Sequence, residues 1–146
     1  MSSNTITRND LKNILNEALP STEVDYILEQ GTVQTTNSTL SAPINWTYRK
    51  WNSGIAECWG TANVASRTYT ANGGSYGFTF PYPSNLFIDS PSCLEVSGGI
   101  NGVVQTQMGY TANNNKDSGQ TYLVNRTASA VTNSGWGFIH AMGRWK

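Results

Sequence analysis

The apolar residues near the start of the chain recur with the spacing of an α-helix. They occupy positions 0, 3, 4 and 7 of one helical face within residues 6–19. The members of this face are Leu11, Ile14, Leu15 and Ala18. Thr7 is suited to the N-cap position, and Pro20 ends the pattern. Because a single short helix is marginal in water, we expect this face to pack on the rest of the chain or on copies of itself around a threefold axis.

From Val24 onward the pattern changes to short runs rich in Val, Ile, Thr, Tyr, Phe and Trp, separated by Gly, Pro, Asn and Ser. Such runs predict strands joined by turns. The expected strands lie within residues 24–33, 46–60, 67–71, 76–80, 86–88, 93–96, 103–110, 121–130 and 136–145, with turns at 72–74, 81–83, 98–102, 113–119 and 133–135. Many short strands at close spacing favour an all-β fold, an antiparallel and jelly-roll-like β-sandwich. The chain then divides into a helical connector, residues 1–22, and a β-sandwich head, residues 23–146.

Residues 46–60, WTYRKWNSGIAECWG, predict a hairpin that turns at residues 52–54. Gly54 tolerates the positive φ that a short loop needs. A three-residue loop places Arg49 opposite Glu57, whereas a two-residue loop places Lys50 opposite Glu57. Both registers set unlike charges side by side. The pattern therefore predicts the strand pair and leaves the two registers open.

In the last expected strand, alternate residues face opposite sides of a sheet. One side carries Phe138, His140, Met142 and Arg144, and the other carries Ile139, Ala141 and Trp145. We expect this strand to be held in place by pairing although it lies next to the C-terminus.

Residues 46–60, together with GRWK at residues 143–146, resemble the C-terminal receptor-binding region of tail fibres and related minor structural proteins of bacteriophages. Those phages infect Gram-positive, often gut, bacteria. ITRNDLKNIL and LPSTEVDYILEQGT, within residues 6–32, resemble the segment that leads into that region, while residues 64–134 carry no such likeness. The resemblance implies a homotrimeric, mostly β adhesin that binds carbohydrate at a fibre tip. Subunit contacts are then expected from the helix face, and contacts with other virion proteins from the N-terminal segment. Trp46, Trp51 and Trp59 suit either the core or a subunit interface, and we expect Trp46 and Trp51 to contribute to the subunit contacts.

Composition and charge limit the classes of molecule that the chain is expected to bind. Thr, Asn, Ser and Gly make up 62 of the 146 residues, only 12% are charged, and the formal net charge is zero. This balance gives no electrostatic attraction to nucleic acid or anionic lipid. No run of about 18 apolar residues is present, so we expect no membrane insertion. The start, MSSNTITRND, is not typical of a secretory signal, and we expect a virion protein made in the bacterial cytoplasm.

The sequence contains few residues that could act in catalysis. His140 is the single histidine of the sequence, and we expect a hydrogen-bonded strand residue rather than a general base. Glycoside cleavage needs two carboxylates about 5–9 Å apart; Asp89 with Glu95 is the candidate pair, since Glu57 is expected to face a cross-strand cation. We therefore expect no catalytic residues and no cofactor.

Metal binding and disulfide formation are also not expected. Residues 113–119 carry oxygen side chains at alternate positions, as calcium loops do, but lack the acid that closes an EF-hand loop. A polar hairpin loop is the expected structure there. Cys58 and Cys93 are the two cysteines, and synthesis in the cytoplasm favours free thiols.

Residues suited to ligand binding are more numerous. Loops rich in Tyr, Asn, Ser and Gly adapt to polar ligands, and loops on a rigid scaffold carry function. The candidate ligand-binding residues are Tyr69, Asn72, Tyr76, Tyr82, Asn85, Tyr110, Asn113, Asn114, Asn115 and Asp117. The expected function is non-catalytic recognition of a bacterial surface polysaccharide. The alternatives are a virion decoration protein such as a head fibre, and a glycan-cleaving tail enzyme.

Overall fold

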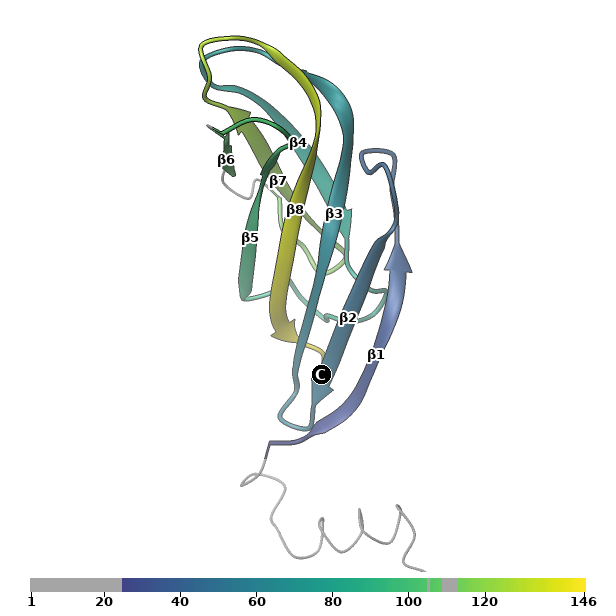
Figure 1. The fold of residues 1–146 in the computed structure, drawn as a ribbon. Helices are drawn as coiled ribbons and strands as arrows, with labels where there is room; N and C mark the ends of the chain where they lie inside the picture. The colour runs from purple at the N-terminus through teal and green to yellow at the C-terminus, as the bar shows by residue number, and fades with distance from the viewer. Residues whose placement is uncertain (1–24, 105, 109–112) are drawn as a thin grey trace, which may run out of the picture.

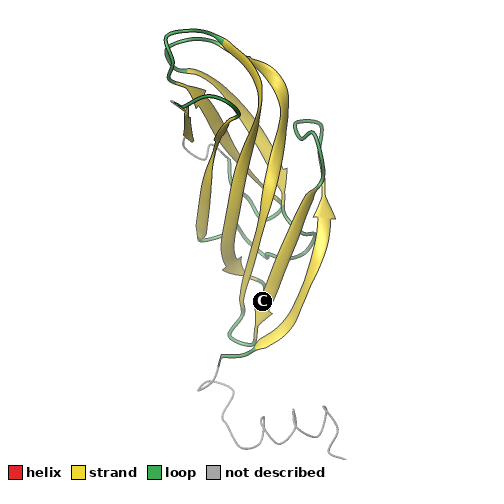
Figure 2. Ribbon diagram, in the orientation of Figure 1, coloured by secondary structure: helices red, strands yellow, loops and turns green. Residues whose placement is uncertain are grey.

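The computed structural model describes residues 25–104, 106–108 and 113–146, and all regular secondary structure in these ranges is β-strand (Figures 1 and 2). The strands are β1 (Ile27–Thr35), β2 (Ile44–Trp51), β3 (Ile55–Tyr69), β4 (Gly74–Pro81), β5 (Cys93–Ile100), β6 (Thr106–Met108), β7 (Ser118–Asn125) and β8 (Val131–Arg144). The helix predicted within residues 6–19 lies outside the described residues. Within the described ranges, no helix is long and apolar enough to cross a membrane.

The strands form two antiparallel sheets. One has five strands in the order β1-β2-β3-β8-β5, and the other has three in the order β4-β7-β6. Figure 1 shows the three-stranded sheet behind the five-stranded one, with the chain crossing from one sheet to the other after β3, β4, β5 and β7. The all-β, antiparallel sandwich predicted from strand spacing is confirmed.

A single apolar core fills the space between the two sheets. Phe78 and Phe80 of β4 meet Ile139 of β8 and Trp46 of β2 there, and all four side chains are fully buried. The indole N–H of Trp46 donates to Thr35 Oγ1 at 2.7 Å and to the Pro81 carbonyl at 3.1 Å. Of the two places predicted for Trp46, the core and a subunit contact, the structure shows the core, since a large aromatic side chain with a satisfied polar atom is stable inside.

The β2–β3 hairpin has the three-residue loop. Arg49 pairs with Glu57, and Thr47 pairs with Trp59, while Gly54 has a φ of 95°. The Arg49 guanidinium lies 3.7 Å from the Glu57 carboxylate. The two-residue loop, with Lys50 opposite Glu57, is thereby excluded.

Several local predictions differ from the structure. Residues 133–135 continue β8 and residues 98–100 complete β5 instead of turning. Residues 86–88 and 126–130 form loops instead of strands. β3 runs on through residues 61–69, with its pairing shifted between Val64 and Arg67. The glycine at 135 serves packing, because a Cβ atom there would overlap the Leu123 side chain of the opposite sheet.

The two cysteines lie on opposite faces of the five-stranded sheet. Cys58 is fully buried and pairs with Ala141, whereas half-buried Cys93 pairs with Met142 on the outer face. Both are free thiols, as predicted. A bridge would need side chains that point toward each other, which these two do not.

Candidate functional site

Two of the candidate tyrosines are core residues. Tyr69 is 1% exposed and Tyr82 is 2% exposed, so neither ring offers a surface to a ligand. Burial raises the pKa of both phenols above the ordinary range. The Tyr82 hydroxyl donates to Asn114 Oδ1 at 2.9 Å, and Asn114 Nδ2 donates to the Pro91 carbonyl at 3.2 Å. The hydrogen bonds of Tyr82 and Asn114 therefore connect two loops instead of contacting a ligand.

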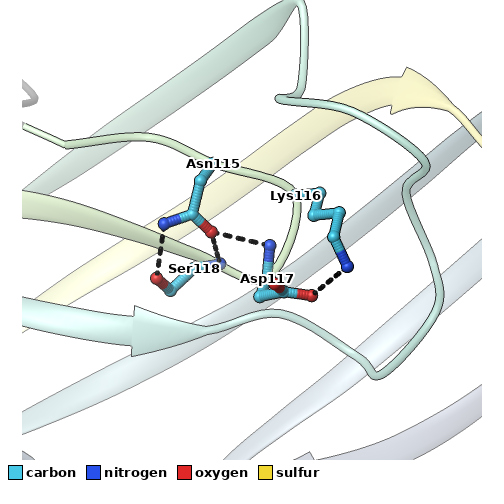
Figure 3. Close-up of polar contacts among 4 residues, drawn as sticks. All are labelled: Asn115, Lys116, Asp117 and Ser118. Atoms are coloured by element: carbon cyan, nitrogen blue, oxygen red, sulfur yellow. Dashed lines mark hydrogen bonds and ion pairs between the residues drawn. The ribbon is translucent and has the colours of Figure 1, made fainter.

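The polar loop before β7 is closed on itself (Figure 3). Asn115 Oδ1 accepts the backbone N–H groups of Asp117 at 2.8 Å and Ser118 at 2.9 Å, an Asx-turn. The Lys116 ammonium lies 3.1 Å from the Asp117 carboxylate. Asn113 Nδ2 donates to Gln120 Oε1 at 3.1 Å. The loop is a polar hairpin connection, as predicted, with most of its hydrogen-bonding groups already used.

The remaining candidates do not meet in one place. Asn72 and Tyr76 lie at the start of β4, whereas Asn85 follows its end. Asn72 and Asn85 are exposed turn residues, each with a φ of 58°, and the Tyr76 ring is covered by the Arg67 guanidinium, 3.1 Å from its centroid. Tyr110 lies outside the described residues. An eight-residue strand spans about 26 Å, so these residues belong to two separate ends of the sandwich.

A pocket of about 180 Å³ lies elsewhere, where β1 and β2 meet the segment after β4. Its lining comprises Glu29, Val33, Gln34, Thr35, Tyr48, Lys50, Pro83, Ser84 and Leu86. A pocket of this size is smaller than the roughly 300–1,000 Å³ of sites that enclose a drug-sized ligand. It therefore suits one end group of a larger molecule.

Three side chains in this pocket hold one another in fixed positions. The Tyr48 hydroxyl donates to Glu29 Oε1 at 2.9 Å, and the Lys50 ammonium donates to Glu29 Oε2 at 3.0 Å. The hydrogen bond from Lys50, followed by the one from Tyr48, lowers the pKa of the Glu29 carboxyl, and the same carboxylate raises the pKa of Tyr48. Glu29 is consequently ionised at neutral pH and acts as a hydrogen-bond acceptor.

The pairing of β1 with β2 creates this arrangement. Glu29 pairs with Lys50, and Gly31 pairs with Tyr48. A Cβ atom at Gly31 would lie 3.0 Å from the Tyr48 hydroxyl, so the tyrosine ring lies across β1 at a residue with no side chain. The sequence did not single out these residues. An acid, a glycine and their partners on the next strand form a recognisable group only when the strand register is known.

Each acidic residue weighed for catalysis lies beside a basic side chain. Glu57 lies 3.3 Å from His140 Nε2 on the outer face of the five-stranded sheet, so His140 is a hydrogen-bonded strand residue, as predicted. Asp89 is bound by Arg144, whose Nε lies 3.0 Å from Asp89 Oδ2. Glu95 projects from β5 opposite His140. Among the described residues, no group of three or more His, Cys, Asp or Glu side chains is gathered for a metal ion.

Trp51, the other tryptophan predicted at a subunit contact, ends β2 at the hairpin and is half-buried. Its carbonyl accepts the indole N–H of Trp145 at 2.8 Å, and the Trp145 backbone N–H donates to the Gly54 carbonyl at 2.9 Å. The C-terminal segment is thus fastened to the hairpin, as the sequence predicted.

Comparison with known proteins identifies the fold. No family model and no curated protein sequence matches the chain. An N-truncated R1-type pyocin tail fibre is similar in structure, with 13% sequence identity and a TM-score of 0.53 over 97% of this chain and 99% of that one. A C-terminal fragment of the R1 pyocin fibre of P. aeruginosa aligns with 16% identity and a TM-score of 0.44, over 77% of this chain and 28% of that one. At such identities the likeness concerns the fold alone.

Proposed function

We propose that this chain is a tail-fibre-like receptor-binding domain that recognises a bacterial surface glycan without cleaving it. The tail-fibre fold supports this assignment, since it extends over nearly the whole of both chains in the first comparison. The observation that carries the proposal is the pocket with its preformed Tyr48–Glu29–Lys50 network. Binding groups held in place before the ligand arrives lose little freedom on binding.

The pocket has the chemistry that sugar hydroxyls need. The Glu29 carboxylate accepts hydrogen bonds, while Lys50 and Ser84 supply donors, and the Tyr48 ring adds an apolar wall. A pocket of about 180 Å³ would hold the terminal unit of a glycan chain.

The contacts that the acids make support a non-catalytic role. Glycosidases place two carboxylates about 5–9.5 Å apart around the scissile bond. In the described residues Glu29 is bound by Lys50, Glu57 faces His140, and Asp89 is bound by Arg144. We therefore expect Asp89→Asn to leave glycan binding intact and purified bacterial polysaccharide to stay uncleaved.

We further propose a homotrimer carried on the virion, whose copies are joined through the apolar face of the N-terminal segment. Weak single sites are strengthened when three are linked. Light scattering should give about three times the 15.9 kDa of one chain. Removal of residues 1–20 should weaken this association, and a monomer at micromolar concentration would contradict it.

Binding to an array of bacterial surface polysaccharides tests the function. Tyr48→Phe removes one hydroxyl from the pocket and should weaken binding about tenfold, and Lys50→Met should do the same. Tyr122→Phe and Lys116→Met make the same changes away from the pocket and should bind as the wild type does. If the wild-type chain binds no glycan and no host cell, the alternative of a virion decoration protein is favoured.

A further inference from the structure

The outer face of β8 exposes two aromatic side chains in a row. Trp136 is 41% exposed and Phe138 is 42% exposed. They are two residues apart on one strand, so both point to the same side of the sheet, about 7 Å from each other along the strand. Ile139 and Ala141, which alternate with them, are fully buried in the core.

The surroundings of these two rings are uncharged. On β3, Asn63 pairs with Trp136 and Thr61 pairs with Phe138. On β5, Ser97 pairs with Phe138, and a glycine, Gly99, pairs with Trp136. Two aromatic rings are thus bordered by amide and hydroxyl groups on the outer face of the sheet.

The charged groups of this face begin at the next pair of strand residues. His140 pairs with Glu95 on one side and with Trp59 on the other. Arg49 lies over the Trp59 ring, 5.0 Å from its centroid. The sheet therefore separates an uncharged aromatic half from an ionic half.

Three of the other four tryptophans have side-chain partners inside the domain. The indole N–H groups of Trp46 and Trp145 are hydrogen-bonded, and the ring of Trp59 is covered by a guanidinium. Within residues 25–104, 106–108 and 113–146, Trp136 and Phe138 make no ring-stacking or cation–π contact, and the Trp136 N–H has no hydrogen-bond acceptor. Both rings are free to contact a ligand.

We propose that Trp136 and Phe138 form a platform on which sugar rings of an uncharged glycan stack, a second contact separate from the pocket between β1 and β2. The inference rests on the proposed glycan-binding function. Sugar rings present flat C–H faces to the aromatic rings, while Asn63, Thr61 and Ser97 hydrogen-bond the hydroxyls at their edges. The absence of charge around the platform complements a neutral sugar and disfavours an acidic one.

The exposed apolar area argues against a second copy of the chain as the occupant. With 41% and 42% of Trp136 and Phe138 exposed and roughly 150–250 Å² on a residue of this kind, the two rings leave roughly 200 Å² uncovered. A stable protein interface buries about 800 Å² on each partner. Extending the contact along β8 would bury the ionic half of the face, and charged residues are depleted from interface cores.

The test uses the full chain and the neutral polysaccharide that the wild type binds most tightly on the array. Trp136→Ala and Phe138→Ala should each weaken binding by about 10–100-fold, the range expected for an aromatic anchor. Trp136→Phe and Phe138→Tyr keep a ring and should retain most of the affinity. Ile88→Ala removes an equally exposed side chain from a loop, 50% exposed in the wild type, and should have no effect.

A variant that keeps both rings tests whether the weaker binding of the alanine variants results from the lost ring or from unfolding. Thr61→Arg places a long side chain beside Phe138 and should block the platform, so binding is lost while the thermal unfolding midpoint is unchanged. If the wild type binds glycan and all these variants bind equally well, the platform is refuted and the proposed function stands. If the wild type binds no glycan, the proposed function itself fails. If Trp136→Ala lowers the mass measured by light scattering, the rings cover a subunit contact and the platform is again refuted.

Discussion

The two faces of the five-stranded sheet are formed by the same strands, but one face is covered by the second sheet and the other is open. The inner face of β8 carries Ile139 and Ala141, which are fully buried against the other sheet, while its outer face carries Trp136, Phe138 and Met142, each between 36% and 42% exposed. Both faces of β8 carry apolar side chains, so the presence of an apolar residue does not by itself tell whether a face is covered. What differs is whether a second layer covers the face. An apolar residue on the covered face stabilises the domain, and one on the open face is available for recognition.

The largest contrast is expected in the reactivity of the two thiols. Cys58 on the inner face is fully buried, and burial raises the pKa of its thiol well above the ordinary value. Because the thiolate is the reactive form, Cys58 should react with a disulfide reagent only through unfolding, at least about a thousandfold more slowly than in the unfolded chain. Half-buried Cys93 should react in the folded state, as Cys93→Ser would verify by removing the fast phase. Equal rates for both thiols in the native protein would contradict the assignment of faces.

Neighbouring residues of β8 give the next largest contrast. Ile139→Ala should lower the free energy of unfolding by about 2–5 kcal/mol, since it leaves a cavity in the core. Phe138→Ala, one residue away on the open face, should cost no more than about 1 kcal/mol. Urea denaturation of both variants measures the difference. A larger loss for Phe138→Ala than for Ile139→Ala would mean that the outer face is covered.

The same Asn-x-Thr turn motif occurs once with a fully buried asparagine and once with a half-buried one, which gives a further comparison of covered and open sites. In both Asn37-Ser38-Thr39 and Asn125-Arg126-Thr127, the Asn Oδ1 accepts the N–H and hydroxyl of the Thr, at 2.9 and 2.7 Å in the first and at 3.0 and 2.7 Å in the second. The fully buried Asn125 also donates to the Ser129 carbonyl at 2.9 Å. Asn125→Ala should cost about 1–3 kcal/mol because buried groups lose their partners. Asn37→Ala, at the half-buried copy, should cost less in the same denaturation experiment.

The smallest effect is expected at the pocket between β1 and β2. The pKa of Glu29 is lowered by Lys50 and Tyr48, so its bonds contribute fully above the ordinary value of 4.5 and are lost as the pH falls below it. The side chain is 51% exposed, and water screens such pairs. Wild type should therefore lose slightly more stability on acidification than Glu29→Gln. Thermal melts at neutral and acidic pH measure this; an identical pH dependence would show that the network adds nothing to stability.

Much of the fold could be predicted from local patterns. The alternation in residues 136–145 predicted which side chains of β8 share a face, because a strand repeats every two residues whatever surrounds it. The hairpin at residues 52–54 was predicted for a similar reason, since Asn, Ser and Gly specify a tight turn locally.

The candidate site was less predictable, because exposure depends on distant parts of the chain. Tyr69, Tyr82 and Trp46 have side chains that suit a surface, a core or an interface, and the opposite sheet buried all three. Glu29, Tyr48 and Lys50 were overlooked because they meet only through the pairing of β1 with β2.

The sequence by itself determined the β class, the alternation of faces and the tight hairpin, since these depend on backbone preferences and on neighbours a few residues away. Only the tertiary structure decided which faces are covered, where the pocket lies and which aromatic rings are left open. The physical reason is that burial is set by the packing of one sheet on another, and that packing joins residues such as Gly135 and Leu123, which no local pattern relates.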